Sequence, residues 1–144
     1  MAFFPASTNP DYQGSLFSAG LLGAAAVLTI VPGCIHSFFP DGGAGVIAGL
    51  DLTQCGPTII KLFAWAGATQ IVFGMVMLLT ALRYRSFVPL LLTLLLLERT
   101  LHAIPAWVLN VAPAHRPPGN YALLVTLPLV ALALRFSLRR SRPA

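Results

Sequence analysis

Four apolar segments, each long enough to cross a bilayer, constrain this chain more than any other feature. They cover residues 15–33, 58–82, 87–108 and 121–138 of a 144-residue sequence. The hydrocarbon core of a bilayer is about 30 Å thick, so a helix needs around 20 apolar residues to cross it. The chain has room for four crossings and short connections. This predicts one all-α membrane domain, residues 1–144, folded as a bundle of four transmembrane helices.

The composition supports a membrane protein and argues against a nucleic-acid partner. Hydrophobic residues make up 57% of the chain and charged residues 9%, whereas soluble domains average roughly 45–50% apolar and about 25% charged residues. The net charge of +5 is compatible with nucleic-acid binding, but the basic residues lie at the ends of the apolar segments. They form no patch interleaved with exposed aromatic residues. We therefore expect membrane lipids as the surroundings and no nucleic acid.

The basic residues also predict the orientation of the four spans. One side of the bundle would carry six arginines, in the turn after the second span and at the C-terminus: Arg83, Arg85, Arg135, Arg139, Arg140 and Arg142. The loops of the other side carry Lys61 and Arg116. Because basic residues favour the cytoplasmic side of a membrane, both termini are predicted to be cytoplasmic, with the connection between the first two spans outside.

This exterior connection, residues 34–57, is long for a helical bundle, where connections usually have two to eight residues. It carries His36, Asp41 and Asp51, and Cys34 and Cys55 stand at its two ends. Exterior compartments permit disulfides, so we predict that the two cysteines pair. In the chain-entropy model such a bond stabilises the fold by about 3 kcal/mol. The alternative is two free thiols that pack against their neighbours.

The stretch "LLLLERTLHAIP", Leu94–Pro105, places ionisable side chains in the middle of the third span. Glu98 follows Phe87 by 11 residues, or roughly 16 Å of helix, which is the depth of the bilayer midplane. A charge there costs about 3 kcal/mol or more, and such residues usually pair or mark a functional site. Glu98 and His102 are four residues apart and share a helix face. Arg99 points about 100° away from them, toward another neighbour or outward.

Three interpretations of these residues remain open. Glu98 and His102 can form a structural cluster with Gln70 or Thr69 of the second span, or they can recognise the head of a lipid, quinone or pigment. They can also form a catalytic or metal site with His36 or Asp41. Because a Glu and a His supply only two ligands and tetrahedral zinc needs three or four, no metal site is predicted.

The turn before the fourth span adds one more candidate contact. His115 stands beside Arg116 in "AHRPPGNY". A rigid turn that contains two prolines and carries a histidine and an arginine is a candidate docking point for a partner. The simpler interpretation is a solvated side chain.

The segment "GATQIVFGMVMLLTALRYRSFVPLLLTLLLLE", Gly67–Glu98, resembles the DoxX-like small four-helix membrane proteins of bacteria. The shared features are a second span bracketed by glycines, a short basic turn and a leucine-rich third span. The resemblance implies a bacterial inner membrane location, and some members look like accessory subunits or assembly factors of larger membrane systems. Where that family often has an acidic residue, this chain has Gln70.

These observations favour a non-enzymatic role. We expect an accessory or structural subunit that packs against other membrane subunits, a second copy of itself or lipids. The alternative is a small membrane enzyme or a binder of a lipophilic ligand that uses Glu98, His102 and a residue of the exterior connection.

Overall fold

Four long helices dominate the part of the chain that the structure describes. The structure, a computed structural model, describes residues 3–109 and 116–139. The helices are α1 (Leu16–Phe38), α2 (Gly56–Arg83), α3 (Val88–Ala103) and α4 (Pro118–Ser137). Two 3₁₀ turns, η1 (Asn9–Asp11) and η2 (Arg85–Phe87), and a π-helical segment, η3 (Ile104–Leu109), complete the elements. Four segments are long and apolar enough to span a membrane, which confirms the predicted fold class.

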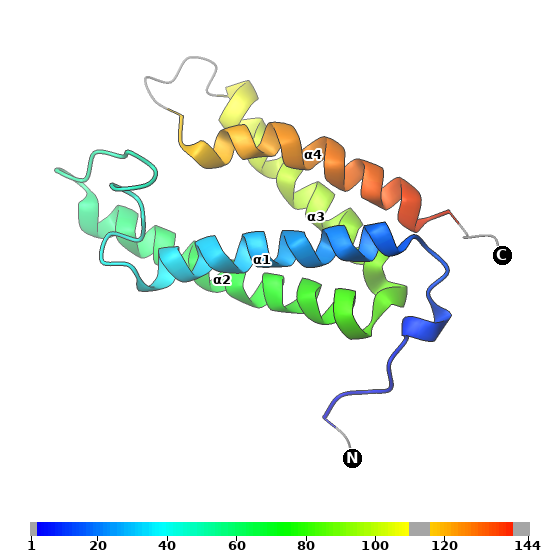
Figure 1. Ribbon diagram of the computed structural model, residues 1–144. Coiled ribbons are helices and arrows are strands. Elements are labelled where there is room, and N and C mark those ends of the chain that lie inside the picture. Colours follow the sequence, from blue (N-terminus) through cyan, green and yellow to red (C-terminus); the bar gives the residue numbers. More distant parts are fainter. Residues whose placement is uncertain (1–2, 110–115, 140–144) are drawn as a thin grey trace.

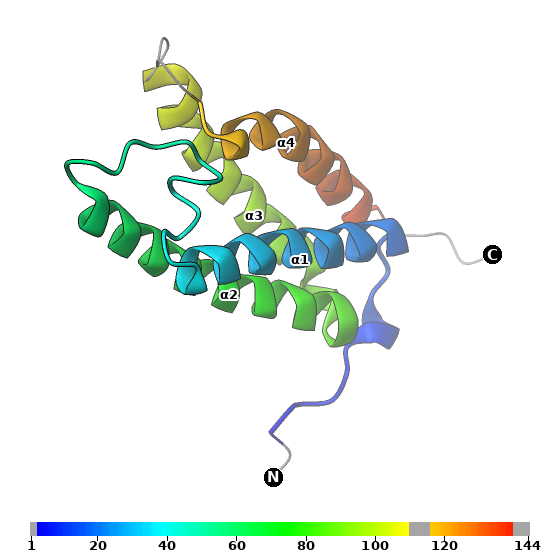
Figure 2. The ribbon, with the colours of Figure 1, turned by 60° about the vertical axis from the view of Figure 1, so that its left-hand side comes forward.

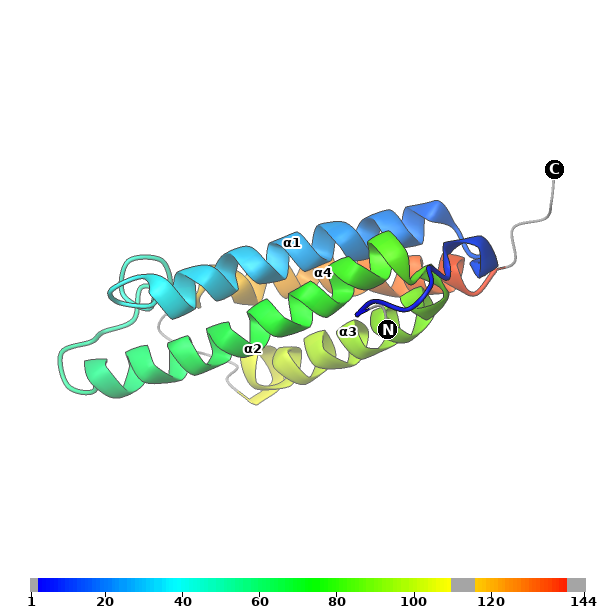
Figure 3. The ribbon, with the colours of Figure 1, turned by 90° about the horizontal axis from the view of Figure 1, so that it is seen from below.

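The helices form two antiparallel hairpins, α1 with α2 and α3 with α4 (Figure 1). Seen from below, α1 and α2 run side by side along their lengths (Figure 3). The two hairpins meet at the end of the bundle that carries both termini and separate toward the other end (Figure 2). We call these the termini end and the loop end.

The hydrophobic core follows this arrangement. Its buried residues come from all four helices: Ala19, Leu22, Ala26, Met77, Ala81, Val88, Leu91, Leu92, Leu95, Val130 and Ala133. All of them lie in the half of their helix that is nearer the termini end. The bundle is therefore held together on that side, and the hairpins are free to diverge at the loop end.

The first helix is longer than the predicted span, which ends at residue 33. The observed α1 continues through Pro32 and Gly33 to Phe38. Proline removes one backbone hydrogen bond, but within a membrane-spanning helix neighbouring groups compensate for such a loss. Gly33 also has a packing role, since a Cβ atom there would lie only 2.9 Å from the carbonyl oxygen of Gly67. The two glycines let the backbones of α1 and α2 approach closely.

This longer helix explains why the predicted disulfide is wrong. Cys34 and Cys55 are both free thiols. Cys34 lies inside α1, next to the point where Gly33 meets Gly67, and Gly67 follows Cys55 by 12 residues along α2. That is roughly 18 Å of helix, whereas the Cα atoms of a disulfide lie within about 7 Å of each other. The alternative of two unpaired cysteines holds.

Hydrogen bonds to Asp41 organise the long connection, residues 39–55, in place of the disulfide. Its carboxylate accepts backbone bonds from Val46 (2.8 Å), Gly43 (2.8 Å) and Gly45 (3.1 Å). The N–H groups of Val46 and then Gly43 hold the pKa of Asp41 below its usual value. Gly43 has a φ of 73°, a left-handed conformation that side chains rarely adopt. Asp41 therefore has a structural role in the loop.

The segment before α1 closes the termini end. Thr8 donates its backbone N–H to the carbonyl of Arg83 (3.1 Å), and the Asn9 side chain donates to the carbonyl of Leu82 (2.8 Å). These bonds satisfy carbonyls that the end of α2 leaves without partners. Within the bundle, the buried Ser18 hydroxyl donates to the carbonyl of Ala133 on α4 (2.7 Å). The two hairpins are thus joined at this end by hydrogen bonds as well as by the core.

The contact between α1 and α2 generates a prediction. A Cβ atom at Gly67 would lie 2.6 Å from the carbonyl oxygen of Gly33, whereas a Cβ atom at Gly20 would meet nothing within 4 Å. Gly67→Ala should lower the free energy of unfolding by about 1–3 kcal/mol, as expected for overpacking. Gly20→Ala should leave it unchanged or raise it. Thermal unfolding of both variants in detergent tests this, and equal melting temperatures would contradict it.

Candidate functional site

Polar side chains from all four helices converge near the depth where the hairpins separate. We call them the polar cluster: Thr29 of α1, Gln70 of α2, Glu98, Arg99 and His102 of α3, and Thr126 of α4. Gln70 lines one groove together with Glu98 and His102. Thr126 lines a cavity together with Arg99. The three α3 residues noted in the sequence are therefore central to a set drawn from the whole bundle.

Glu98 is the ionic centre of the polar cluster. Its Oε1 lies 3.0 Å from Nδ1 of His102, and its Oε2 lies 3.2 Å from Nε of Arg99. Arg99 also donates from Nη2 to the hydroxyl of Thr29 on α1 (3.3 Å). The link to α1 fits the expected direction of Arg99 toward another neighbour. The spacing along the helix does not predict the contact between Nε of Arg99 and the carboxylate of Glu98.

Several polar atoms of the cluster have no hydrogen bond. Among the described residues these include three buried oxygens, Gln70 Oε1, Glu98 Oε2 and Thr126 Oγ1. Glu98 Oε2 is within ion-pair distance of Arg99 Nε, but it accepts no hydrogen bond. Leaving a buried acceptor unsatisfied costs about 1–3 kcal/mol. The cluster therefore has unused capacity to accept hydrogen bonds.

Two grooves open onto the cluster from the side. The larger, which we call the α2–α3 groove, has a volume of about 560 Å³ and combines Gln70, Glu98 and His102 with apolar walls that include Leu62, Trp65, Phe73 and Leu94. The second has a volume of about 430 Å³ and leads from the cluster to α4. The side chain of His102 lines both grooves and is 59% exposed. The imidazole is therefore accessible from outside the bundle through both grooves.

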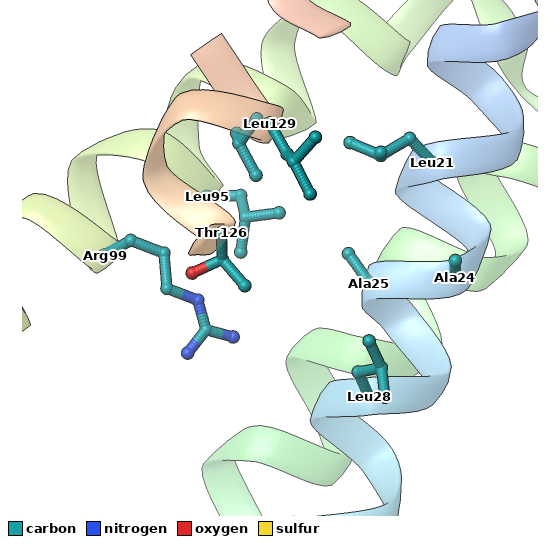
Figure 4. A pocket seen from close by; sticks show the side chains of 9 residues that line it. Leu21, Ala24, Ala25, Leu28, Leu95, Arg99, Thr126 and Leu129 are labelled. Atoms are coloured by element: carbon teal, nitrogen blue, oxygen red, sulfur yellow. The ribbon is translucent and has the colours of Figure 1, made fainter. Parts of the chain in front are cut away.

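A smaller cavity, which we call the α1–α4 cavity, lies on another side of α3 (Figure 4). Its volume is about 100 Å³. Arg99 extends toward it from α3, and Thr126 faces it from α4 (Figure 4). Arg99 therefore lines both this cavity and the second groove, whereas Glu98 lines the α2–α3 groove.

A local distortion shapes the loop end of α3. Pro105 has no N–H to donate to the carbonyl of Leu101, and the chain continues as the π-helical segment η3. The indole of Trp107 donates to the carbonyl of Asn120 (3.1 Å). The guanidinium of Arg116 lies 4.2 Å above the Trp107 ring and donates to the carbonyl of Ala106. These contacts join η3 to the start of α4 and fix the outer end of the second groove.

The remaining sequence candidates lie away from the polar cluster. His36 is seven residues beyond Thr29 on α1. The centroids of the His36 and Phe63 rings are 4.9 Å apart, and Nδ1 of His36 lies 2.7 Å from the carbonyl oxygen of Gly42. Asp41 is bound within its loop. His115 is outside the described residues. In residues 3–109 and 116–139, no three His, Cys, Asp or Glu side chains gather as a metal site.

Sequence reasoning missed Thr29 and Thr126. A threonine in an apolar segment often bonds to its own helix, as Thr29 does to the carbonyl of Ala25 (2.8 Å). Its presence alone therefore gives no signal of a site. Only the packing of α1 and α4 against α3 reveals the contribution of these two residues.

Comparison with family models, with curated proteins and with solved structures finds no match to this chain. The resemblance to DoxX-like proteins therefore stays a prediction.

The pairing of Glu98 yields a prediction on stability. Glu98→Gln keeps an oxygen that accepts from His102, so the free energy of unfolding should stay close to that of the wild type. Glu98→Leu leaves both Arg99 and His102 without their partner and should lower it by about 1–3 kcal/mol. Denaturation in detergent followed by circular dichroism measures the difference. Equal stability of the two variants would show that the carboxylate position has no structural partner.

Proposed function

We propose that this small polytopic membrane protein binds an amphiphilic molecule dissolved in the bilayer, in the α2–α3 groove. The polar head of the ligand would lie at Gln70, Glu98 and His102, and its apolar part along Trp65 and Phe73. One observation carries the proposal: buried acceptors without hydrogen bonds, Gln70 Oε1 and Glu98 Oε2, belong to residues that line a groove with largely apolar walls. Ligand sites combine apolar walls with a few convergent polar groups in this way.

The chemistry of the lining favours a hydroxyl-bearing head. Nδ1 of His102 lies 3.0 Å from Glu98 Oε1, so Nε2 is the ring nitrogen that a ligand can reach, and it accepts in a neutral imidazole and donates in a protonated one. Gln70 and Glu98 offer acceptors in the same groove, and a ligand hydroxyl, which both donates and accepts, matches them and either form of His102. A lipid alcohol or another lipophile with hydroxyl groups fits this set better than a ligand that only accepts hydrogen bonds.

A role as an accessory subunit is the second candidate, and a specific feature of α2 favours it. The α2–α3 groove continues into a shallow groove that shares Trp65, Thr69 and Phe73 with it and extends to Val76. Together they run from Leu62 to Val76 along one helix, roughly 21 Å, a length over which a partner helix could pack. In that case an amide or hydroxyl of the partner, or of a second copy, would donate to Gln70.

Native mass spectrometry of protein purified in mild detergent tests the ligand proposal. The wild type should retain one class of hydroxyl-bearing lipid, and Gln70→Leu should lower its occupancy at least tenfold, which corresponds to about 1.4 kcal/mol. Thr93→Val is the matched control, because the exposed Thr93 hydroxyl donates to its own helix, at the carbonyl of Pro89. A co-purifying protein in place of the lipid would favour the accessory role. Purification with neither a lipid nor a partner protein would contradict both candidates.

We also propose that the termini end is cytoplasmic, because Arg83, Arg85 and Arg139 lie at that end and Lys61 and Arg116 at the other. The location in a bacterial inner membrane is part of the same proposal and is supported by the sequence resemblance alone.

Site-directed labelling checks this orientation and the number of spans. With Cys34 and Cys55 replaced by serine, Ser86→Cys should react with an impermeant thiol reagent only from the cytoplasmic side. Asn120→Cys should react only from the outside. Labelling of both positions from one side would contradict the four-span arrangement.

A further inference from the structure

The α1–α4 cavity is apolar except at one place. Aliphatic side chains of three helices form most of its wall: Leu21, Leu28, Leu95, Leu129 and Val130. The polar members are Arg99 and Thr126 (Figure 4). Neither residue's role here is explained by the α2–α3 groove, since that groove is lined by Glu98 and His102 and not by Arg99 or Thr126.

The guanidinium of Arg99 has most of its donors unused. Arginine carries five N–H donors, and within the described part of the chain one of them makes a hydrogen bond, to Thr29. The contact with Glu98 is an ion pair at 3.2 Å. The Arg99 side chain is only 24% exposed, so solvent can satisfy few of these donors. Thr126 Oγ1, which lines the same cavity, is buried without a hydrogen-bond partner.

We propose that the α1–α4 cavity binds a single-chain carboxylic amphiphile, a long-chain fatty acid, with its carboxyl group on Arg99 and Thr126 and its chain between α1 and α4.

The carboxyl group matches the polar end of the cavity in either protonation state. An ionised carboxylate accepts two parallel bonds from a guanidinium, the pairing for which arginine is best suited, and a third bond from the Thr126 hydroxyl. A neutral acid accepts from Arg99 and donates its own O–H to Thr126 Oγ1. Both forms satisfy groups that the protein itself leaves unpaired.

The size of the cavity selects a single chain. A volume of about 100 Å³ is smaller than the roughly 150 Å³ cavity that holds a benzene molecule. An aliphatic segment matches this volume more closely than a ring or a pair of acyl chains does. The remainder of the chain would leave between α1 and α4 into the surrounding bilayer.

The depth of Arg99 argues for a carboxylic acid and against a phospholipid. Arg99 follows Val88, the first residue of α3, by 11 residues, or roughly 16 Å, and so lies near the bilayer midplane. A phosphate headgroup keeps its charge and would pay the full cost of leaving the interface. A fatty acid can reach this depth in its neutral form and then pair with the guanidinium.

Binding of palmitic acid labelled with ¹³C at the carboxyl, followed by NMR on the full chain in detergent, tests the proposal. Palmitic acid should shift its carboxyl resonance on binding. Hexadecanol, which has the same chain but no acid, and phosphatidylglycerol should displace it at least tenfold less well than unlabelled palmitic acid. Equal displacement by either competitor would overturn the assignment of a single-chain acid.

Variants separate this site from the α2–α3 groove. Arg99→Lys, which keeps the charge but loses the planar fork, and Ala25→Leu, which fills the cavity, should each weaken binding at least tenfold. Ala131→Leu is the matched control on the exposed face of α4 and should bind like the wild type, as should Gln70→Leu. Unchanged binding by a folded Ala25→Leu would overturn the proposal. Loss of binding in Gln70→Leu alone would place the acid in the α2–α3 groove instead.

Discussion

A carboxylate in a helix that is apolar enough to span a membrane needs partners, and Glu98 has two. His102 lies one turn along the same helix at 3.0 Å, and the adjacent Arg99 returns to Glu98 at 3.2 Å while it also reaches α1 through Thr29. Charged groups cannot be replaced here by apolar packing without leaving a counter-charge unpaired. The core fills the half of the bundle nearer the termini, and the hairpins separate toward the other end (Figure 2). Every groove and cavity of the candidate site is lined by at least one member of this triad.

The sequence predicts the helices well because apolar length is the dominant signal in a membrane chain. The bounds of α2, α3 with η3, and α4 differ from the predicted spans by only a few residues. The error is at α1, where the predicted span stops at Gly33, next to a proline that would disrupt a helix in water. In the hydrocarbon core no water is present to hydrogen-bond the backbone groups that the end of a helix exposes, so a helix continues through a proline. The wrong prediction of a disulfide follows from that error, because Cys34 lies within the longer helix and away from Cys55.

The candidate site is only partly visible in the sequence. Glu98, His102 and Gln70 stand out because polar residues within apolar segments are costly. Thr29 and Thr126 do not, since a threonine in an apolar segment commonly bonds to its own helix. The decisive property of the site is the set of oxygens that remain without hydrogen bonds after folding. That property depends on how the two hairpins pack, and spacing along one helix carries no information about it.

The account depends on Glu98 and His102 interacting, and a double-mutant cycle measures this most directly. The free energies of unfolding of Glu98→Leu, His102→Leu and the double variant would be compared with that of the wild type in one detergent. If the two side chains pair as described, the double variant should lose less stability than the sum of the single losses, by at least about 0.5 kcal/mol. Additive losses, within the roughly 0.3–0.5 kcal/mol typical of independent sites, would contradict it.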